Sequence, residues 1–370
     1  MSAQEIAFQF EVPGRIVTLE SIGTGNVNDT YLVIQRTTFS EEQFILQKIN
    51  QTVFQDPAAV MANIKAITDH AHCKIEAEAD HSDRIWQLPR VIPTADGKDY
   101  AVDQNGEFWR ALSLIASSTC HEKVTDPEHA VEAGVVLGHF QRLIADFPIE
   151  DLQDTLPGFH ITPEYLENYD RILEDVPEAK KRIDASSEAS RLAKFVERRR
   201  EFASVLEDAV KRGELRHRPI HGDPKITNIM IDNFTGKGTS IIDLDTVKPG
   251  LIHYDFGDAA RSSCNPAGEE TKDISKVRLD MDLFEGLVRG YLREANEFLT
   301  DEDRHYLFDS IRLITFELGL RFFADYLAGD VYFKTSYDGQ NLNRARVQFA
   351  LCDSIEARES MMRRTLESFS

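Results

Sequence analysis

The chain is poor in cysteine, and its few cysteines are not paired along the sequence. Only Cys73, Cys120, Cys264 and Cys352 occur among its 370 residues, and no two of them form a CxxC pair. Wide spacing of this kind favours isolated reduced thiols over a disulfide framework or a zinc site. The start of the chain also lacks a basic segment followed by an apolar one, so we expect no signal peptide and a cytoplasmic protein.

Long apolar runs and an excess of positive charge are also missing. No run approaches the roughly 20 consecutive apolar residues that a membrane span needs. Lysine and arginine number 42 against 63 aspartates and glutamates, which gives a formal net charge of −21. A surface this acidic repels nucleic acids and anionic membranes, so we expect neither as a partner. We expect a monomer that binds small molecules, and a site for an anionic ligand must supply its positive charge locally.

What is present is an ordinary globular composition. Hydrophobic residues make up 42% of the chain and charged residues 28%, a balance typical of folded soluble domains. A chain of this length has room for a large core, and we expect two lobes, residues 1–116 and 117–370. The fold class that we predict is α+β, with a small β-rich N-terminal lobe and a large, mostly helical C-terminal lobe.

The first third of the chain has the pattern of a small mixed sheet with one helix. Runs of β-branched and aromatic residues predict strands, and glycine-containing turns separate them. We expect strands at residues 15–19, 30–34, 44–49, 88–93 and 108–115, and a helix from 56 to about 71. Gly23 and Gly25 lie in the first turn, where backbone N–H groups could approach the phosphates of a nucleotide.

After residue 126 the hydrophobic periodicity becomes mostly helical. Pro127 suits the first turn of a helix. Residues 163–212 are rich in Glu, Lys and Arg, which predicts solvated helix faces rather than a binding site. Two short strands follow, near Ile220 and Ile241, and a long helical segment closes the chain.

The most informative residues lie around these two short strands. Asp223 follows the first strand, and Asn228 comes five residues later. A glycine turn at residues 236–238 then predicts a hairpin that brings Asp243, at the end of the second strand, close to Asn228. Amide and carboxylate oxygens suit Mg²⁺, and a carboxylate beside them can accept a hydroxyl proton. This trio predicts phosphoryl transfer from a nucleotide.

Lys225 stands two residues after the expected base. From there its ammonium group can neutralise the negative charge that builds up on the transferred phosphoryl group. The alternative is an exposed loop lysine without a catalytic role.

Two neighbouring patterns offer other interpretations. His221 could join Asp223 and Asp243 in a hydrolytic metal site, but Pro219 predicts an extended segment between His217 and His221. Four extended residues span roughly 13 Å, too far for both histidines to bind one ion, so a structural role for His221 is favoured. The sequence Asp-Phe-Gly at residues 255–257 spells a kinase metal motif, but it lies too far from Asp223. We predict instead that Asp255 anchors the catalytic loop from a following helix.

A polar stripe crosses an otherwise apolar helical segment at residues 311–327. Glu317, Arg321 and Asp325 recur at positions i, i+4 and i+8 and therefore share one helix face. The stripe is either a structural ladder of salt bridges or a polar face that grips a hydroxylated acceptor, and the residues alone leave both open.

Four segments of the chain resemble the aminoglycoside phosphotransferase and choline kinase superfamily, and within it the bacterial N-acetylhexosamine 1-kinases. They are residues 23–33, 44–47, 241–246 together with 255–258, and 321–333. The resemblance runs over nearly the whole chain. It implies a protein-kinase-like fold that uses ATP and Mg²⁺. It also implies that Asp223 is the base, that Asn228 and Asp243 are the Mg²⁺ ligands, and that the sugar contacts are Asn28, Arg321, Tyr332 and Asp325.

The sequence departs from these relatives at two positions. Gln47 occupies the place on the third strand where the superfamily usually has a basic residue, and we expect Lys225 to compensate. Ser262 follows Arg261 where the hexosamine kinases have an aromatic residue, and this bears on which hexose is bound.

The resemblance leads to a specific functional prediction. We expect the protein to transfer the γ-phosphoryl group of ATP to the anomeric hydroxyl of an N-acetylhexosamine, GlcNAc or GalNAc. The alternatives are a kinase for another hexose, homoserine, choline or an aminoglycoside, and a nucleotide-binding pseudokinase.

Overall fold

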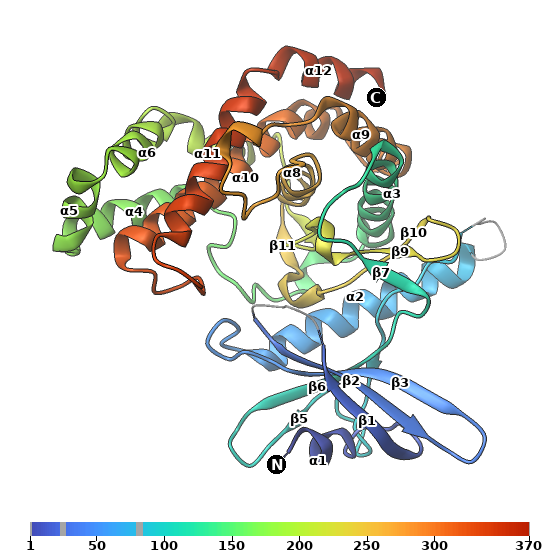
Figure 1. The fold of residues 1–370 in the computed structure, drawn as a ribbon. Coiled ribbons are helices and arrows are strands. Elements are labelled where there is room, and N and C mark those ends of the chain that lie inside the picture. Colours follow the sequence, from blue (N-terminus) through green and yellow to red (C-terminus); the bar gives the residue numbers. More distant parts are fainter. Residues whose placement is uncertain (1, 23–26, 79–83, 370) are drawn as a thin grey trace.

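The computed structural model describes residues 2–22, 27–78 and 84–369. Gly23 and Gly25, predicted to approach the phosphates, lie outside the described residues. The chain forms a small sheet-based lobe and a larger, mostly helical lobe (Figure 1). The predicted two-lobed α+β architecture is therefore confirmed.

The small lobe is built on one antiparallel sheet. Its strands follow one another in space in the order β1-β2-β3-β6-β4, and β5 pairs with β6. The strands are β1 (Arg15–Ser21), β2 (Asp29–Arg36), β3 (Glu41–Lys48), β4 (Val91–Ile92), β5 (Ala101–Val102) and β6 (Phe108–Ser113). Burial alternates along β2 and β3, where Val33, Phe44 and Leu46 are buried and their neighbours Ile34 and Ile45 only partly so, because successive side chains of a strand point to opposite faces. Helix α1 (Ala3–Ala7) packs on the buried face, where Phe44, Leu46 and Trp109 form the core of this lobe.

Helix α2 (Pro57–Glu78) lies between the sheet and the helical lobe (Figure 1). Its apolar side, including Val60, Ile64 and Ile67, belongs to the core of the large lobe. Asn63 in this helix donates hydrogen bonds to the carbonyls of Gln153 and Val247. The helix therefore ties the sheet to the part of the large lobe that carries the expected site.

The large lobe is a packed set of helices. They are α3 (Pro127–Ile144), α8 (Ile252–Ser263), α9 (Met281–Ala295), α10 (Asp301–Ala328), α11 (Gln340–Glu356) and α12 (Glu359–Ser368). Helix α3 begins at Pro127, as predicted, and Asp126 caps it by accepting a hydrogen bond from the His129 N–H. Helices α3 and α9 lie in close contact because glycines face the partner backbone. A Cβ on Gly134 would fall 2.1 Å from the Leu287 carbonyl oxygen.

The charged segment at residues 163–212 forms four amphipathic helices, α4 (Thr162–Asp175), α5 (Pro177–Ala185), α6 (Ser187–Glu197) and α7 (Val205–Lys211). Their apolar sides, with Leu166, Tyr169 and Phe195, pack on one another and on helices α10 and α11. The exposed sides carry ion pairs such as Arg200 with Asp170 and Glu197. The predicted solvated helix faces are confirmed.

Two small sheets carry the residues of the expected site. Strand β8 (Arg218–Ile220) pairs with β11 (Lys248–Gly250), and β9 (Ile229–Asp232) forms a hairpin with β10 (Gly238–Ile241). Strand β7 (Ser118–Cys120) pairs with the other side of β9. The predicted hairpin is confirmed, although the strand begins at Ile229 rather than at Asn228. Among the described helices none is long and apolar enough to cross a bilayer.

Candidate active site

One buried carboxylate, that of Asp255, anchors the loop that follows β8. Asp255 of helix α8 accepts hydrogen bonds from the backbone N–H groups of His221, at 2.9 Å, and Gly222, at 2.8 Å. Gln141 of helix α3 donates to the same carboxylate at 3.1 Å. Burial raises the pKa of Asp255, and the hydrogen bonds that it accepts oppose this rise. The predicted anchoring role of Asp255 is confirmed.

His221 is a structural residue of the loop. Its Nε2 lies 3.0 Å from the Ile242 carbonyl oxygen, and its Nδ1 accepts a hydrogen bond from the Asp223 N–H at 3.2 Å. A ring that donates from Nε2 and accepts at Nδ1 is neutral, and burial lowers the pKa of His221. Within residues 2–22, 27–78 and 84–369, no three His, Cys, Asp or Glu side chains are arranged to hold a metal ion. The geometry therefore supports the structural interpretation of His221 over the hydrolytic metal site.

Gly222 gives the loop its sharp turn before Asp223. Its φ is +88°, and a Cβ there would lie 2.6 Å from the Thr246 carbonyl oxygen. Only glycine adopts this conformation without steric cost. The turn places Asp223 directly after the two backbone N–H groups that Asp255 anchors.

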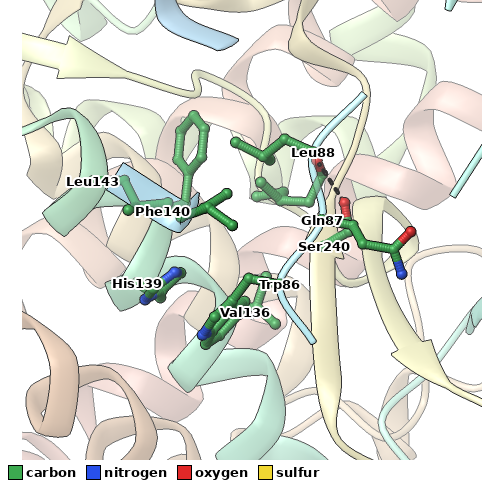
Figure 2. Close-up of a pocket in the computed structure, with 10 residues that line it drawn as sticks. Trp86, Gln87, Leu88, Val136, His139, Phe140, Leu143 and Ser240 are labelled. Atoms are coloured by element: carbon green, nitrogen blue, oxygen red, sulfur yellow. Dashed lines mark hydrogen bonds between the residues drawn. The ribbon is translucent and has the colours of Figure 1, made fainter. Parts of the chain in front are cut away.

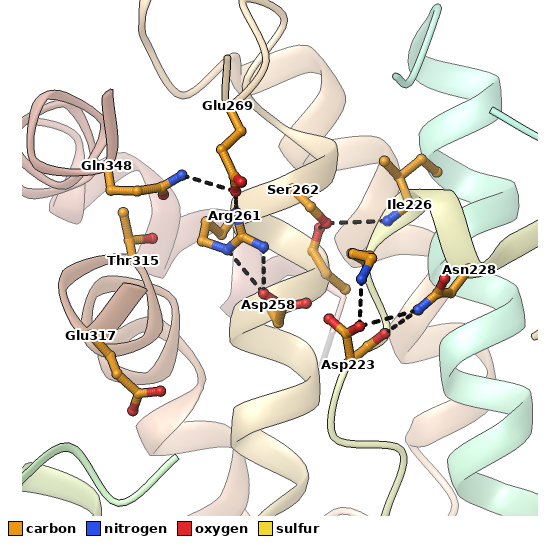
Figure 3. A network of polar contacts seen from close by, with 12 residues as sticks. Asp223, Ile226, Asn228, Asp258, Arg261, Ser262, Glu269, Thr315, Glu317 and Gln348 are labelled. Atoms are coloured by element: carbon orange, nitrogen blue, oxygen red, sulfur yellow. Dashed lines mark hydrogen bonds and ion pairs between the residues drawn. The ribbon is translucent and has the colours of Figure 1, made fainter. Parts of the chain in front are cut away.

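The structure brings Asp223, Lys225 and Asn228 together (Figure 3). Lys225 Nζ lies 2.5 Å from Asp223 Oδ2. The amide nitrogen of Asn228 donates to the Asp223 carbonyl oxygen at 2.7 Å. Asn228 sits in a short 3-10 turn, η4 (Ile226–Asn228), and its amide oxygen is the atom that a cation would use.

Lys225 remains positively charged in this setting. Burial lowers its pKa, but the negative charges of Asp223 and Asp243 raise it more, so the pKa lies above its ordinary value. The ammonium group thus lies within the electrostatic reach of both aspartates. This placement supports the catalytic interpretation of Lys225 over that of a free loop lysine.

Asp243 lies at the end of strand β10 in an unusual backbone conformation. Its φ is +66°, a strained value for a residue with a side chain, and such strain gathers at functional sites. The Ile242 N–H donates to the Asn228 carbonyl oxygen at 2.9 Å, which brings Asp243 close to Asn228. The side chain is solvent-accessible but has protein on most sides. Partial burial and the charges of Asp245 and Asp223 raise the pKa of Asp243 to about 6.

Asn228 and Asp243 fit a magnesium ion by their chemistry. Mg²⁺ binds one or two carboxylate or amide oxygens together with phosphate oxygens and water. Burial is the main cause of the raised pKa of Asp243, and repulsion by Asp245 and Asp223 adds to it. A divalent cation relieves repulsion of this kind.

Gln47, which stands where the superfamily usually has a basic residue, binds a buried arginine of the neighbouring strand. Gln47 on β3 pairs directly with Arg110 on β6. The Nε and Nη2 atoms of Arg110 donate to Gln47 Oε1 at 2.9 and 2.7 Å, and Arg110 also forms an ion pair with Asp245. The side chains of Arg110 and Asp245 are only 1% and 3% exposed. The positive charge of Arg110 also acts on Asp243 and lowers its pKa, and compensation for Gln47 by Lys225 stays a prediction.

Asn28 also contacts Asp245. Its amide nitrogen donates to Asp245 Oδ2, and its amide oxygen accepts a hydrogen bond from the Asn50 N–H at 3.0 Å. Both ends of the Asn28 side chain are therefore engaged within the protein, and its contact with a sugar stays a prediction.

Arg321 lies in a cage of aromatic rings. Its guanidinium carbon is 5.3 Å from the ring centre of Phe159, 5.0 Å from Tyr165 and 5.6 Å from Phe333. The nearest carboxylate oxygen that pairs with it, Glu317 Oε1, is 4.0 Å away. Burial lowers the pKa of Arg321, but interactions with Tyr165, Glu317 and Asp223 raise it more, and the pKa lies above its ordinary value. The guanidinium group is thus held by ring faces close to the expected base, with hydrogen-bonding capacity for a ligand.

Tyr332 lies beside this cage and is 64% exposed. Asp325, by contrast, is buried and fully engaged. Its carboxylate accepts hydrogen bonds from the N–H groups of Val331, Tyr332 and Phe333, and from the Asn341 amide. Asp325 therefore shapes the segment that carries Tyr332 and Phe333, and an acceptor contact of its own stays a prediction.

The predicted polar stripe divides into three different roles. Glu317 binds His160 and Thr162, Arg321 faces the aromatic cage, and Asp325 anchors the following segment. The stripe is thus neither a continuous salt-bridge ladder nor a uniform acceptor-binding face.

Arg261 and Ser262 lie next to the loop at residues 221–228, which carries the predicted base (Figure 3). Arg261 donates from Nε and Nη2 to Asp258 Oδ1 at 2.9 and 2.6 Å, and Nη1 donates to Glu269 at 3.1 Å. Ser262 accepts a hydrogen bond from the Ile226 N–H at 3.3 Å. The serine that replaces the expected aromatic residue therefore supports the catalytic loop directly.

One small cavity lies near the helical core. It is lined mainly by Trp86, Leu88, Val136, His139 and Phe140 (Figure 2). Trp86 stacks on His139 with the ring centres 3.6 Å apart. The cavity's volume of about 10 Å³ is near the lower limit for a single water, so it is a packing gap rather than a substrate site.

Comparisons with known proteins agree with this geometry. Residues 18–304 match the model of the phosphotransferase enzyme family known as APH. The chain belongs to this family. The predicted membership of the aminoglycoside phosphotransferase and choline kinase superfamily is therefore confirmed at the level of the family.

Several solved structures have a similar fold. A microcompartment-associated aminopropanol kinase is 18% identical, with 98% of each chain covered and a TM-score of 0.59. An aminoglycoside phosphotransferase from Alicyclobacillus acidocaldarius is 13% identical over 100% of this chain and 97% of that one, with a TM-score of 0.58. An ethanolamine kinase from Plasmodium vivax is 13% identical over 90% of this chain and 82% of that one, with a TM-score of 0.54. The likeness confirms the protein-kinase-like fold.

Proposed function

We propose that this phosphotransferase moves the γ-phosphoryl group of ATP to a hydroxyl of a small neutral acceptor, and that the acceptor is an N-acetylhexosamine phosphorylated at carbon 1. The observation that carries the proposal is the assembly of Asp223, Lys225 and Asn228 on one loop next to Asp243. These groups combine a base, a cation and two oxygen ligands, which is the set that phosphoryl transfer needs.

Each residue has a separate task in this proposal. Asp223 orients the acceptor hydroxyl and takes its proton, and Lys225 balances the charge that develops on the transferred group. Asn228 and Asp243 hold Mg²⁺, which when bound neutralises the phosphate charges. No covalent intermediate is required, because positioning and electrostatics supply most of the catalysis.

The surroundings of Arg321 support a neutral acceptor. A guanidinium group with its faces covered by Phe159, Tyr165 and Phe333 presents donors to oxygen atoms such as hydroxyl and acetyl oxygens. The aromatic rings offer flat apolar surface to a sugar ring. We propose that Arg321 and Tyr332 contact the acceptor, and that Asp325 acts indirectly by holding the segment of Tyr332.

The alternative acceptor class is an amino alcohol. Two of the similar structures are described as aminopropanol and ethanolamine kinases. A cationic acceptor would be repelled by Arg321, and the carboxylate closest to it, Glu317, is already paired with His160. This electrostatic argument is our reason for placing the neutral sugar first.

The decisive experiment measures ADP release with Mg-ATP and a panel of hexosamines, hexoses and amino alcohols. We expect release that depends on GlcNAc or GalNAc, with the phosphate on carbon 1 of the product. Preferential turnover of an amino alcohol would replace the sugar proposal. Nucleotide binding without turnover of any acceptor would support a pseudokinase instead.

The base is tested by Asp223→Asn, which keeps the size of the side chain but removes its basicity. We expect the turnover number to fall by about 10²-fold or more, while the affinity for ATP changes little. Asp69→Asn, on the exposed side of helix α2, is the matched control and should leave turnover unchanged. Near-normal turnover of the Asp223 variant would refute the assignment.

A further inference from the structure

His160 connects the catalytic loop to helix α10. It lies just before helix α4 with a positive φ of 68°, a backbone conformation that is strained for residues other than glycine. Its side chain is only 5% exposed. Nδ1 lies 3.0 Å from Glu317 Oε1, and Nε2 lies 2.7 Å from the Gly222 carbonyl oxygen.

The chemistry of these two partners sets the charge of the ring. A carboxylate and a carbonyl can only accept hydrogen bonds, so both ring nitrogens must donate, and only the imidazolium form has two N–H groups. A neutral ring would turn a nitrogen lone pair toward one of the two oxygens. Burial lowers the pKa of His160, but the Glu317 carboxylate and the hydrogen bonds raise it more, and the pKa lies above its ordinary value.

The position of Gly222 makes this contact important for the reaction. The peptide groups on either side of Gly222 are each held by a buried side chain, since its N–H donates to Asp255 and its C=O accepts from His160. The next residue is Asp223. A shift of this carbonyl would therefore move the base relative to the acceptor hydroxyl and Lys225.

Glu317 links His160 to Arg321, the residue proposed to contact the phosphoryl acceptor. Its second carboxylate oxygen accepts a hydrogen bond from Thr162 at 2.7 Å, and its first oxygen is 4.0 Å from Arg321. Figure 3 shows Glu317 on its helix, on the opposite side of Asp258 from the catalytic loop. His160 is thus the group that joins the helix of Arg321 to the backbone beside Asp223.

We propose that His160 is a positioning residue, held as an imidazolium between Glu317 and the Gly222 carbonyl, that fixes Asp223 for proton transfer and couples it to the acceptor side. The inference rests on the proposed kinase function. Charged groups that act on the ring come from two helices: Glu317 and Arg321 from α10, and Asp258 from α8. Tyr254 of α8 stacks on the ring with the centres 5.4 Å apart.

A structural measurement tests the charge without relying on activity. In protein labelled with ¹⁵N-histidine, we expect His160 to carry protons on both ring nitrogens at pH 7.5, with its signals assigned by their loss in His160→Gln. Glu317→Gln should return the ring to the neutral form at that pH. A neutral His160 in the wild-type protein would overturn the proposal, whatever the outcome of the acceptor panel.

Kinetics then separate a positioning role from a merely structural one. With the acceptor identified in the panel, His160→Ala should lower kcat by about 10²-fold, since misplacing a catalytic group by about 1 Å costs this much. The KM for ATP should stay within about twofold of the wild-type value. His160→Gln can still donate to the Gly222 carbonyl, so it should recover part of the loss.

The pH dependence of kcat tests whether the charged form of His160 is the active one. The imidazolium is present below the raised pKa of His160 and is lost above it, so kcat should fall as pH rises through that pKa. Glu317→Gln should move the fall to lower pH. His253→Gln is the matched control, because His253 is also buried and binds a backbone carbonyl, that of Asp303. Equal kcat in His160→Ala, His253→Gln and the wild type, with intact folding by circular dichroism, would overturn the proposal.

Discussion

The buried pair of Arg110 and Asp245 joins the small lobe to the segment that follows Asp243, and its loss should be costly. Arg110→Met replaces the guanidinium group with a shorter, uncharged, unbranched side chain next to Met61, whose sulfur is 4.0 Å from Arg110 Nη1. The substitution leaves the Asp245 carboxylate, which is 3% exposed, without its cation. It also leaves Gln47 Oε1 without both of its donors from Arg110.

The expected loss of stability follows from the burial of the Arg110–Asp245 pair. Removing one partner of a buried ion pair costs about 3–5 kcal/mol, because the remaining charge is uncompensated. The double variant Arg110→Met/Asp245→Asn removes both charges, and Asn28 can still donate to the remaining amide oxygen. We therefore expect the double variant to lose less than the sum of the two single variants, with a coupling energy of about 1–3 kcal/mol.

The assay is urea unfolding of the single and double variants. The chain has only two tryptophans, Trp86 and Trp109, and Trp109 neighbours Arg110, so intrinsic fluorescence reports on the relevant region. Arg36→Met is the matched control in the same sheet. Its partner Glu41 is 40% exposed and Arg36 itself 56%, and exposed pairs contribute about 0–1 kcal/mol.

Two results would refute the reasoning. A loss of less than about 1 kcal/mol for Arg110→Met would show that the buried pair is not a main link between the lobes. Additivity of the two single variants within about 0.5 kcal/mol would show that Arg110 and Asp245 do not act on each other.

Three further predictions concern the catalytic loop and the acceptor side. Lys225→Met should lower kcat by about 10²–10³-fold through loss of charge stabilisation in the transition state, and steady-state kinetics that show an unchanged kcat would contradict this. Gly222→Ala should destabilise the protein by about 1–3 kcal/mol in urea unfolding, because of its φ of +88° and the contact with Thr246. Asp325→Asn weakens the hydrogen-bond acceptor for three backbone N–H groups. It should therefore raise the KM for the phosphoryl acceptor more than the KM for ATP. An effect on both KM values alike would contradict the anchoring role.

Local sequence patterns were sufficient for much of the site. The spacing of Asp223, Asn228 and Asp243 and the glycine turn between the last two predicted the hairpin, and the structure forms it. The roles of His221 and Asp255 were also predicted correctly, because proline and chain separation limited the alternatives. Short-range geometry governs these features, so one stretch of sequence contains the information.

Arg110 and His160 could not be predicted in this way. Arg110 meets Gln47, 63 residues away, only because of the register between β3 and β6. His160 meets Gly222 and Glu317 over separations of 62 and 157 residues. Neither residue lies in a recognisable motif, and a lone histidine or arginine in a sequence carries no sign of its partners.

Asp325 shows a different limit of prediction from sequence. Its helical spacing placed it correctly on the face of Glu317 and Arg321, but the chain after helix α10 turns back and delivers three N–H groups to it. The sequence by itself determined the two-lobed fold, the catalytic loop and its neighbouring hairpin, because these depend on periodicity, turns and short spacing. Only the tertiary structure decided which buried charges meet, since strand register and helix packing join residues that are far apart in the chain.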